Sequence, residues 1–374
     1  MRIGVNTRLL IAGKMDGIGW FTSESLQQIV SAHPEHDFYF FFDRKPSEIF
    51  LFGDNVHAVV LCPQARHPVL WYLFFECSLP RAIRKYKIDL FLSPDGFLPL
   101  RASIPTLTVI HDINFEHAQG NIKPSHQRYM THYFPRYAKG ATRVATVSEY
   151  SKKDIANTYG IPEEKIDVVY NGSHSNYHPY GDEADQATRA QYTQGKSYFI
   201  FISTILKRKN LAHLLTAFDK VRERHDMKLV VVGARVWWQD ELKEAFNRMK
   251  HADDVIFLGR ADAEALSRLL SAATALVYPS YFEGFGIPIL ESFYAETPVI
   301  TSNVTSMPEV AGDAAILIDP ADSESIASAM NRLSENEELR KELIEKGREQ
   351  RTKFSWEQTG RLLWESMMKT LSTK

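Results

Sequence analysis

The sequence lacks most features that mark secreted, membrane-spanning or nucleic-acid-binding proteins. Its two cysteines, Cys62 and Cys77, are too few for a disulfide framework or a four-thiolate zinc site, so we expect a cytoplasmic protein. No apolar run approaches the roughly 18 residues that a membrane-spanning helix needs, and the opening MRIGVNTRLL holds no signal-peptide core. The 44 basic and 46 acidic residues leave a net charge of -2, which argues against a dedicated nucleic-acid binder.

Three catalytic signatures are also missing. Gly195-Lys196-Ser197 is preceded by Ala190 at the position where an NTPase phosphate loop requires glycine. Gly13, Gly17 and Gly19 lack the Gly-x-Gly-x-x-Gly spacing of a dinucleotide-dependent oxidoreductase. No Asp-x-Asp pair is present to hold a divalent cation on a diphosphate, so we expect no metal site.

Short apolar runs alternate with amphipathic stretches, a pattern typical of parallel sheets with crossover helices. With 374 residues and 44% hydrophobic residues, the chain is long enough for two such domains. We expect an α/β protein with two Rossmann-like, doubly wound domains. The expected strands are 2–6, 38–42, 58–61, 89–92, 106–110, 143–146 and 166–169, then 198–202, 228–232, 255–258, 275–278, 298–301 and 315–318.

Changes in composition set the expected domain limits. Residues 1–172 form the first domain, and the polar stretch 173–196 is expected to be a linker. Residues 197–353 form the second domain. A last helix over 354–374, capped by Ser355, is expected to cross back to the first domain.

The sequence after the expected strand 275–278 carries the strongest functional pattern. It reads PSYFEGFGIPILE and enters a helix at Pro288, a residue tolerated in a helical first turn. Glycines at the carboxyl end of a parallel strand let backbone N–H groups approach a diphosphate. The expected donor-binding residues of this loop are Glu283, Gly284, Phe285, Gly286, Ile287 and Glu291. Glu283 as a solvated loop charge and Glu291 as a partner of the helix dipole remain the alternatives.

A second cationic loop follows strand 198–202 and reads STILKRKN. Lys207, Arg208 and Lys209 suit a diphosphate because their side chains give charge-assisted hydrogen bonds. The alternative is a solvated basic loop. Because both loops leave carboxyl ends of parallel strands, we expect them to converge.

The two loops resemble those of glycosyltransferase family four. Four further segments carry the same resemblance: VIHD at 109–112, VSEYSKKDI at 147–155, IDVVYNG at 166–172 and MPEVAGDAAILIDP at 307–320. The resemblance spans nearly the whole chain and is closest in kind to the mannosyltransferase-like branch of bacterial surface-polysaccharide synthesis. It implies a GT-B fold with two domains facing across a cleft, a nucleotide on the second domain, an acceptor on the first, and retention of configuration without metal.

The resemblance also implies residue roles. Glu283 would contact the donor sugar hydroxyls, Glu291 the ribose and Lys209 the diphosphate. His111 would contact the sugar near the reacting carbon, and Gly17 to Gly19 would form a loop closing over the donor. A core histidine bonded to a backbone carbonyl is the alternative for His111.

One position departs from the family pattern. Many relatives carry a Gly-Arg pair where this sequence has Ser203-Thr204. Arg208 is the candidate replacement for that arginine, and Lys209 ranks above it.

We therefore expect a hexosyltransferase that uses a GDP- or UDP-linked sugar, with no other cofactor, and a saccharide or lipid-linked saccharide acceptor. The rival functions are a nucleotide-sugar epimerase of the same fold and a non-catalytic nucleotide-sugar-binding protein. The aromatic stretch 71–75 suggests peripheral association with the inner face of the membrane, although a buried helix explains it better.

Overall fold

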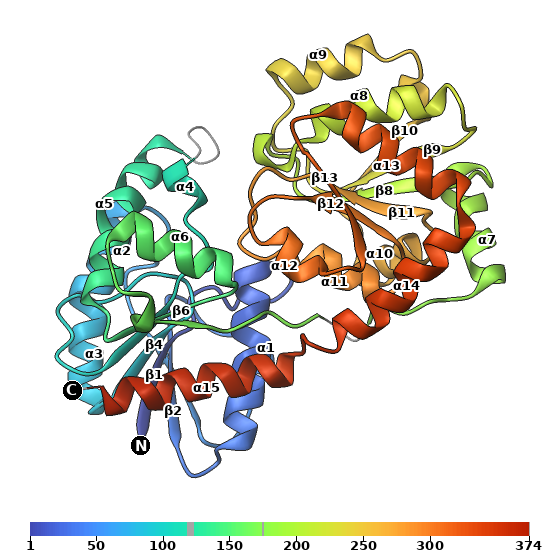
Figure 1. The fold of residues 1–374 in the computed structure, drawn as a ribbon. Coiled ribbons are helices and arrows are strands. Elements are labelled where there is room, and N and C mark those ends of the chain that lie inside the picture. Colours follow the sequence, from blue (N-terminus) through green and yellow to red (C-terminus); the bar gives the residue numbers. More distant parts are fainter. Residues whose placement is uncertain (118–122, 174–175, 374) are drawn as a thin grey trace. The chain divides into compact units, whose positions relative to one another are not determined.

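The chain divides into two compact units, each built on its own parallel sheet (Figure 1). The first contains Met1–Gly172 and Ser355–Lys374, and the second contains Ser173–Phe354. The computed structural model describes residues 1–117, 123–173 and 176–373. Residues 174–175 of the expected linker and residue 374 of the expected last helix lie outside the described residues.

The first unit has a seven-stranded sheet with the order β3-β2-β1-β4-β5-β6-β7, and every neighbouring pair is parallel. Its strands are β1 (Arg2–Asn6), β2 (Asp37–Phe42), β3 (Val56–Val60), β4 (Leu90–Ser93), β5 (Thr106–Val109), β6 (Arg143–Thr146) and β7 (Ile166–Val168). Its helices are α1 (Gly17–Ala32), η1 (Glu48–Phe50), α2 (Pro68–Leu73), η2 (Phe74–Ser78), α3 (Leu79–Tyr86), α4 (Asn114–His117), α5 (Pro124–Gly140), α6 (Glu149–Tyr159), η3 (Glu163–Lys165) and α15 (Trp356–Ser372).

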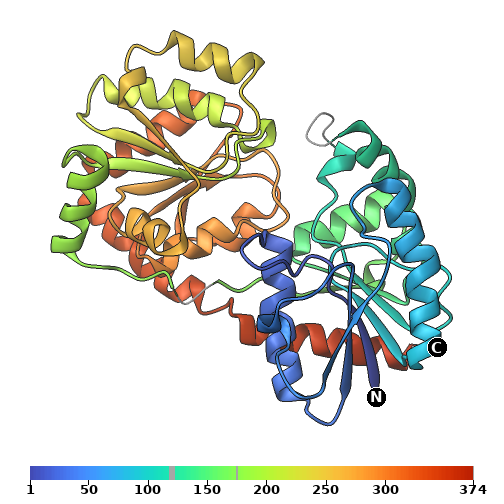
Figure 2. The ribbon, with the colours of Figure 1, turned by 180° about the vertical axis from the view of Figure 1, so that it is seen from behind.

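An aromatic core lies between this sheet and helices α2, α3, α5 and α6. Trp71, Phe74 and Phe75 belong to it and are buried, so these aromatic side chains pack inside the unit, as a buried helix predicts, while Leu73 of the same stretch is exposed. Segments α2, η2 and α3 follow one another without a break, and η2 is a single π-helical turn. The opposite face of the sheet is covered by α1 and α15 (Figures 1 and 2).

Helix α15 returns to the first unit at the far end of the sequence. The Ser355 side chain accepts a hydrogen bond from the Gln358 N–H, which confirms the expected cap. Ser366 donates to Asp167 on β7 at 2.7 Å. A Cβ on Gly172 would lie 2.4 Å from the Trp356 nitrogen, so only glycine lets the two chain segments pass this closely.

The second unit has a six-stranded parallel sheet with the order β10-β9-β8-β11-β12-β13. Its strands are β8 (Tyr198–Ile202), β9 (Lys228–Val232), β10 (Val255–Gly259), β11 (Ala275–Tyr278), β12 (Val299–Ser302) and β13 (Ala315–Ile318). Its helices are α7 (Asp182–Thr193), η4 (Lys207–Lys209), α8 (Leu211–Arg222), α9 (Asp240–Arg248), η5 (Ala252–Asp254), α10 (Ala263–Ser271), α11 (Ile287–Tyr294), α12 (Met307–Ala311), α13 (Ser323–Glu335) and α14 (Glu337–Arg351). Helices α8, α9 and α13 lie on one face of the sheet, and α10, α11 and α14 lie on the other (Figures 1 and 2).

All thirteen expected strands form within two residues of the expected limits. The two Rossmann-like domains are therefore confirmed. Two expectations about loops are wrong. The stretch 173–196 is not a linker between the units, because it contains α7, which packs against α10 in the second unit. Gly17 to Gly19 do not form a loop but the first turn of α1, where the Asp16 carboxylate accepts from the Gly19 N–H at 3.0 Å.

Candidate functional site

In the second unit, the strand order reverses between β8 and β11, and the two expected loops leave the carboxyl ends of these strands. Open α/β sheets bind ligands at such a reversal. The Tyr281 N–H donates to the Arg208 carbonyl oxygen at 2.8 Å, so the backbones of the two loops touch. The expected convergence is confirmed.

Three charged side chains meet where the loops touch. Lys209 Nζ donates to Glu283 Oε1 and, at 3.0 Å, to the Tyr278 hydroxyl. Arg208 Nη1 donates to Glu283 Oε2 at 3.1 Å and to the Phe282 carbonyl at 2.9 Å. We call Arg208, Lys209 and Glu283 the charged triad. Arg208 therefore points into the site and not into solvent.

The triad is held away from water. Lys209 is 7% exposed and Glu283 is 6% exposed. Burial opposes ionisation of Glu283, but the charges of Lys209 and Arg208 prevail and lower its pKa to about 2. Glu283 is thus a carboxylate at neutral pH, and its burial excludes the alternative of a solvated loop charge.

Two further residues fix the loops, and the sequence did not single them out. Asn210, 2% exposed with φ of 60°, donates from Nδ2 to the carbonyls of Pro279 (2.9 Å) and Pro320 (2.6 Å). The Ser306 hydroxyl lies 2.9 Å from the Glu283 carbonyl oxygen and 3.0 Å from that of Phe285. Their roles depend on partners 21 to 110 residues away, so no local pattern reveals them.

The glycine loop leads into α11 as expected. Gly286 has φ of 106°, a conformation that favours glycine, and caps the helix ahead of Pro288 in its first turn. Gly284 and Phe285 precede this cap and Ile287 is the first residue of the helix, so all three lie near its positive end. This end suits an anion such as a phosphate.

Glu291 lies one turn into α11 and is half-buried. Burial raises its pKa to about 7, and a hydrogen bond from Tyr177 only partly offsets this effect. Tyr177, which the sequence did not reveal, precedes α7. Glu291 is thus not part of the charged triad, and its pKa is raised whereas that of Glu283 is lowered.

In the first unit, His111 follows β5 and is half-buried. Its Nε2 donates to the Pro94 carbonyl oxygen at 2.9 Å, and its ring meets Phe21 of α1 edge-on at 4.8 Å. Burial lowers the pKa of His111 despite the nearby carboxylates, so the ring is neutral at pH 7. A carbonyl can only accept, so Nε2 carries the proton and Nδ1 is an acceptor. This hydrogen bond is the one that the core-histidine alternative describes.

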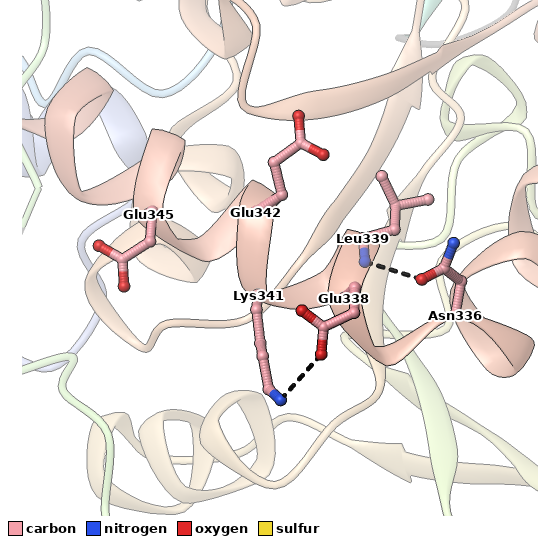
Figure 3. Close-up of a pocket in the computed structure, with 6 residues that line it drawn as sticks. All are labelled: Asn336, Glu338, Leu339, Lys341, Glu342 and Glu345. Carbon is pink, nitrogen blue, oxygen red and sulfur yellow. Dashed lines mark hydrogen bonds and ion pairs between the residues drawn. The ribbon is translucent and has the colours of Figure 1, made fainter.

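One surface hollow of the second unit lies on α14. Figure 3 shows a surface hollow lined by Asn336 and by residues of α14, where Lys341 pairs with Glu338 at 3.2 Å. It contains none of the expected site residues. Within the described ranges, no three His, Cys, Asp or Glu side chains are grouped to hold a metal ion. The same ranges contain no helix that is both long and apolar enough to cross a membrane.

Comparison with known proteins gives a consistent result. The family model "Glycosyltransferase Family 4" matches residues 16–175, and "Glycosyl transferases group 1" matches residues 184–350. O-antigen chain mannosyltransferase B of Escherichia coli is 31% identical over 307 residues, 80% of either chain. O-antigen chain mannosyltransferase RfbU of Salmonella typhimurium is 29% identical over 270 residues, 72% of this chain and 71% of that protein.

Solved structures show the same fold at lower identity. Sucrose-phosphate synthase from Thermosynechococcus elongatus superposes with a TM-score of 0.79 at 16% identity, over the whole of both chains. HepE of Anabaena, solved with UDP and glucose, gives 0.75 at 18% identity over 98% of this chain and 99% of that one. With two Rossmann-like domains of the GT-B type and these relatives, the chain belongs to glycosyltransferase family 4.

Proposed function

We propose that this protein is a retaining, metal-independent mannosyltransferase. It moves mannose from a GDP- or UDP-linked donor to a saccharide or lipid-linked saccharide acceptor in surface-polysaccharide synthesis. Family membership supports the transferase activity, and the names of the two O-antigen mannosyltransferases support the sugar and the pathway.

The charged triad is the observation that carries this proposal. In a nucleotide sugar the diphosphate is bonded directly to the anomeric carbon, so the groups that bind each part must be neighbours. Lys209 and Arg208 suit the diphosphate, and Glu283, in contact with both, suits the sugar hydroxyls. Glu291 accepts hydrogen bonds from the ribose, and His111 orients the transferred sugar through its neutral ring.

The triad also suits the proposed chemistry. The bond from the anomeric carbon to the diphosphate oxygen breaks, and negative charge develops on the leaving group. Lys209, Arg208 and the N-terminal end of α11 stabilise this charge without an ion. The acceptor oxygen bonds to the anomeric carbon from the same face, and a phosphate oxygen of the leaving group takes the acceptor's proton. Configuration is then retained.

One assay tests the proposal as a whole. The purified protein is incubated in excess chelator with GDP-mannose or UDP-sugars and a mannose-terminated acceptor, and the product is analysed by NMR. We expect transfer with one of the donors and an anomeric configuration equal to that of the donor. Activity that returns only with magnesium or manganese contradicts metal independence, and an inverted product contradicts retention. Conversion of the donor without acceptor indicates an epimerase, and binding without turnover indicates a binding protein.

We further infer that the first unit associates with anionic membrane surfaces. Helix α5 exposes Arg128, Arg136 and Lys139, and the sequence from 123 to 143 contains no Asp or Glu. Exposed Val69 and Leu73 lie on neighbouring α2. A cationic surface with exposed aliphatic side chains favours an anionic bilayer.

Vesicle sedimentation tests this inference. We expect binding to phosphatidylglycerol vesicles but not to phosphatidylcholine vesicles, and loss of binding when Arg128 and Arg136 are both changed to Glu. Arg248→Glu, an exposed arginine on α9 of the second unit, is the control. Equal binding to both kinds of vesicle contradicts the inference.

A further inference from the structure

A buried polar network lies in the first unit where its strand order reverses, between β1 and β4. Asn6 ends β1, Arg8 follows it, and Asp95 follows β4. Arg8 is 8% exposed and Asp95 is 7% exposed. Nothing in the proposed transfer chemistry uses this ion pair directly.

The Asp95 carboxylate is fully engaged. Its Oδ2 accepts from Arg8 Nε at 2.6 Å. Its Oδ1 accepts from Asn6 Nδ2 at 2.8 Å, from Ser93 Oγ at 3.2 Å and from the Phe97 N–H at 3.3 Å. A buried carboxylate with this set of donors has one orientation, because any rotation would leave charged or polar atoms unpaired.

Arg8 connects this carboxylate to the neighbouring loops. Its guanidinium carbon lies 4.4 Å from the centre of the Phe97 ring, a cation–π contact. Its Nη1 donates at 3.3 Å to the Ala65 carbonyl, which also accepts from Trp71 Nε1 at 2.8 Å. The segments after β1, β3 and β4 are thereby tied together at one edge of the sheet.

The network sets the position of one atom that contacts His111 in the same unit. Pro94 lies between Ser93 and Asp95, whose side chains are both held in the network. The Pro94 carbonyl belongs to the peptide that joins it to Asp95, so the anchored Asp95 sets its direction. This carbonyl accepts the Nε2 proton of His111 at 2.9 Å.

We propose that Arg8 and Asp95 are positioning residues that hold the Pro94 carbonyl against His111 and so fix the orientation of the His111 ring. The proposal rests on the role of His111 in the proposed function. A buried ion pair seldom stabilises a fold more than apolar side chains of the same shape. We infer that the Arg8–Asp95 pair serves instead to orient the Pro94 carbonyl toward Nε2 of His111.

The test compares variants with a matched control. Asp95→Asn removes the charge but keeps an acceptor at Oδ1. Because Asp95→Asn leaves Arg8 without a counter-ion, the double variant Arg8→Met with Asp95→Asn removes both charges and covers the case in which the single variant fails to fold. The control is Asp167→Asn, which alters a half-buried carboxylate of the first unit that pairs with Arg143 at 2.8 Å.

Two readouts are needed. The first is the Nε2 proton of His111 in NMR, assigned by its loss in His111→Gln. We expect slow exchange with water in the native protein and in Asp167→Asn, and fast exchange in both Asp95 variants. The second is turnover. In the Asp95 variants we expect kcat to fall at least about tenfold, because small displacements of a positioned group are costly, with KM for the donor nearly unchanged.

The outcomes separate the two proposals. If the His111 proton stays protected in the double variant, or if Asp167→Asn exposes it equally, Arg8 and Asp95 do not position the ring. If the His111 proton exchanges fast in the Asp95 variants but kcat is unchanged, the orientation of the ring does not contribute to transfer. If His111→Gln itself keeps full turnover, the role of His111 in the proposed function is wrong, whereas the exchange measurement still reports on positioning.

Discussion

Lys209 and Glu283, 74 residues apart in the sequence, form a buried ion pair between the loops that follow β8 and β11. Arg208 approaches the same carboxylate from its other oxygen. The pair joins the two strands at which the order of the second sheet reverses. In the proposed function, this contact places the binding groups for the sugar and the diphosphate side by side.

Lys209→Met is expected to lower kcat by about 10²-fold and donor affinity much less, because the lysine matters most when charge develops on the leaving diphosphate. Steady-state kinetics and calorimetric binding of the donor measure the two effects. Lys228→Met is the control, since Lys228 is 8% exposed and pairs with the carboxylate of Asp254 in the same unit. Equal losses of turnover in both variants would show that Lys209 has only a structural role.

Arg208→Ala is expected to reduce turnover nearly as much as loss of Lys209, because in the proposed function Arg208 binds the diphosphate in place of the arginine missing at Thr204. The structure turns Arg208 toward Glu283, with its side chain 19% exposed. Arg222→Ala is the matched control, with a side chain 20% exposed and an ion pair to Asp254. A mild effect on turnover, no larger than in the control, would show that Arg208 does not bind the diphosphate.

Glu291 is expected to make stability depend on pH. Its pKa is about 7 in the folded protein and near 4.5 when unfolded, so the folded state binds the proton more tightly. The contribution of Glu291 to the free energy of unfolding is therefore most favourable below pH 4.5. It decreases by at most about 3 kcal/mol as pH rises from 4.5 to 7. Thermal midpoints of the native protein and Glu291→Gln, measured across this range, test this effect. The difference between them should shift in favour of the variant as pH rises, and a constant difference would contradict the raised pKa.

The fold was predictable because each strand of a doubly wound sheet is a short apolar run with polar residues at its end. The triad was predictable in part, since KRKN and EGFG are local patterns at strand ends. Helix α7 was missed because only Thr188 and Thr193 are buried in it, so its sequence reads as a polar loop. Its acidic first turn, beginning at Asp182, was the available signal.

The supporting residues were not predictable. Asn210, Ser306 and the Arg8–Asp95 pair act through partners that are distant in the sequence, and such partners become apparent only when strand ends meet at one edge of a sheet. The prediction of a loop at Gly17 to Gly19 was wrong for a different reason. Glycines usually indicate a loop, but the Asp16 cap starts the helix at Gly17.

The role of Glu283 in holding the donor sugar is tested most directly by comparing turnover with nucleotide binding in Glu283→Gln. The control is Asp254→Asn, because Asp254 lies between Lys228 and Arg222 as Glu283 lies between Lys209 and Arg208. We expect Glu283→Gln to lower kcat/KM at least about tenfold and to leave the affinity for the free nucleoside diphosphate nearly unchanged, since that ligand has no sugar. Unchanged turnover, or an equal loss of affinity for the free nucleotide, would contradict the assignment of Glu283 to the sugar.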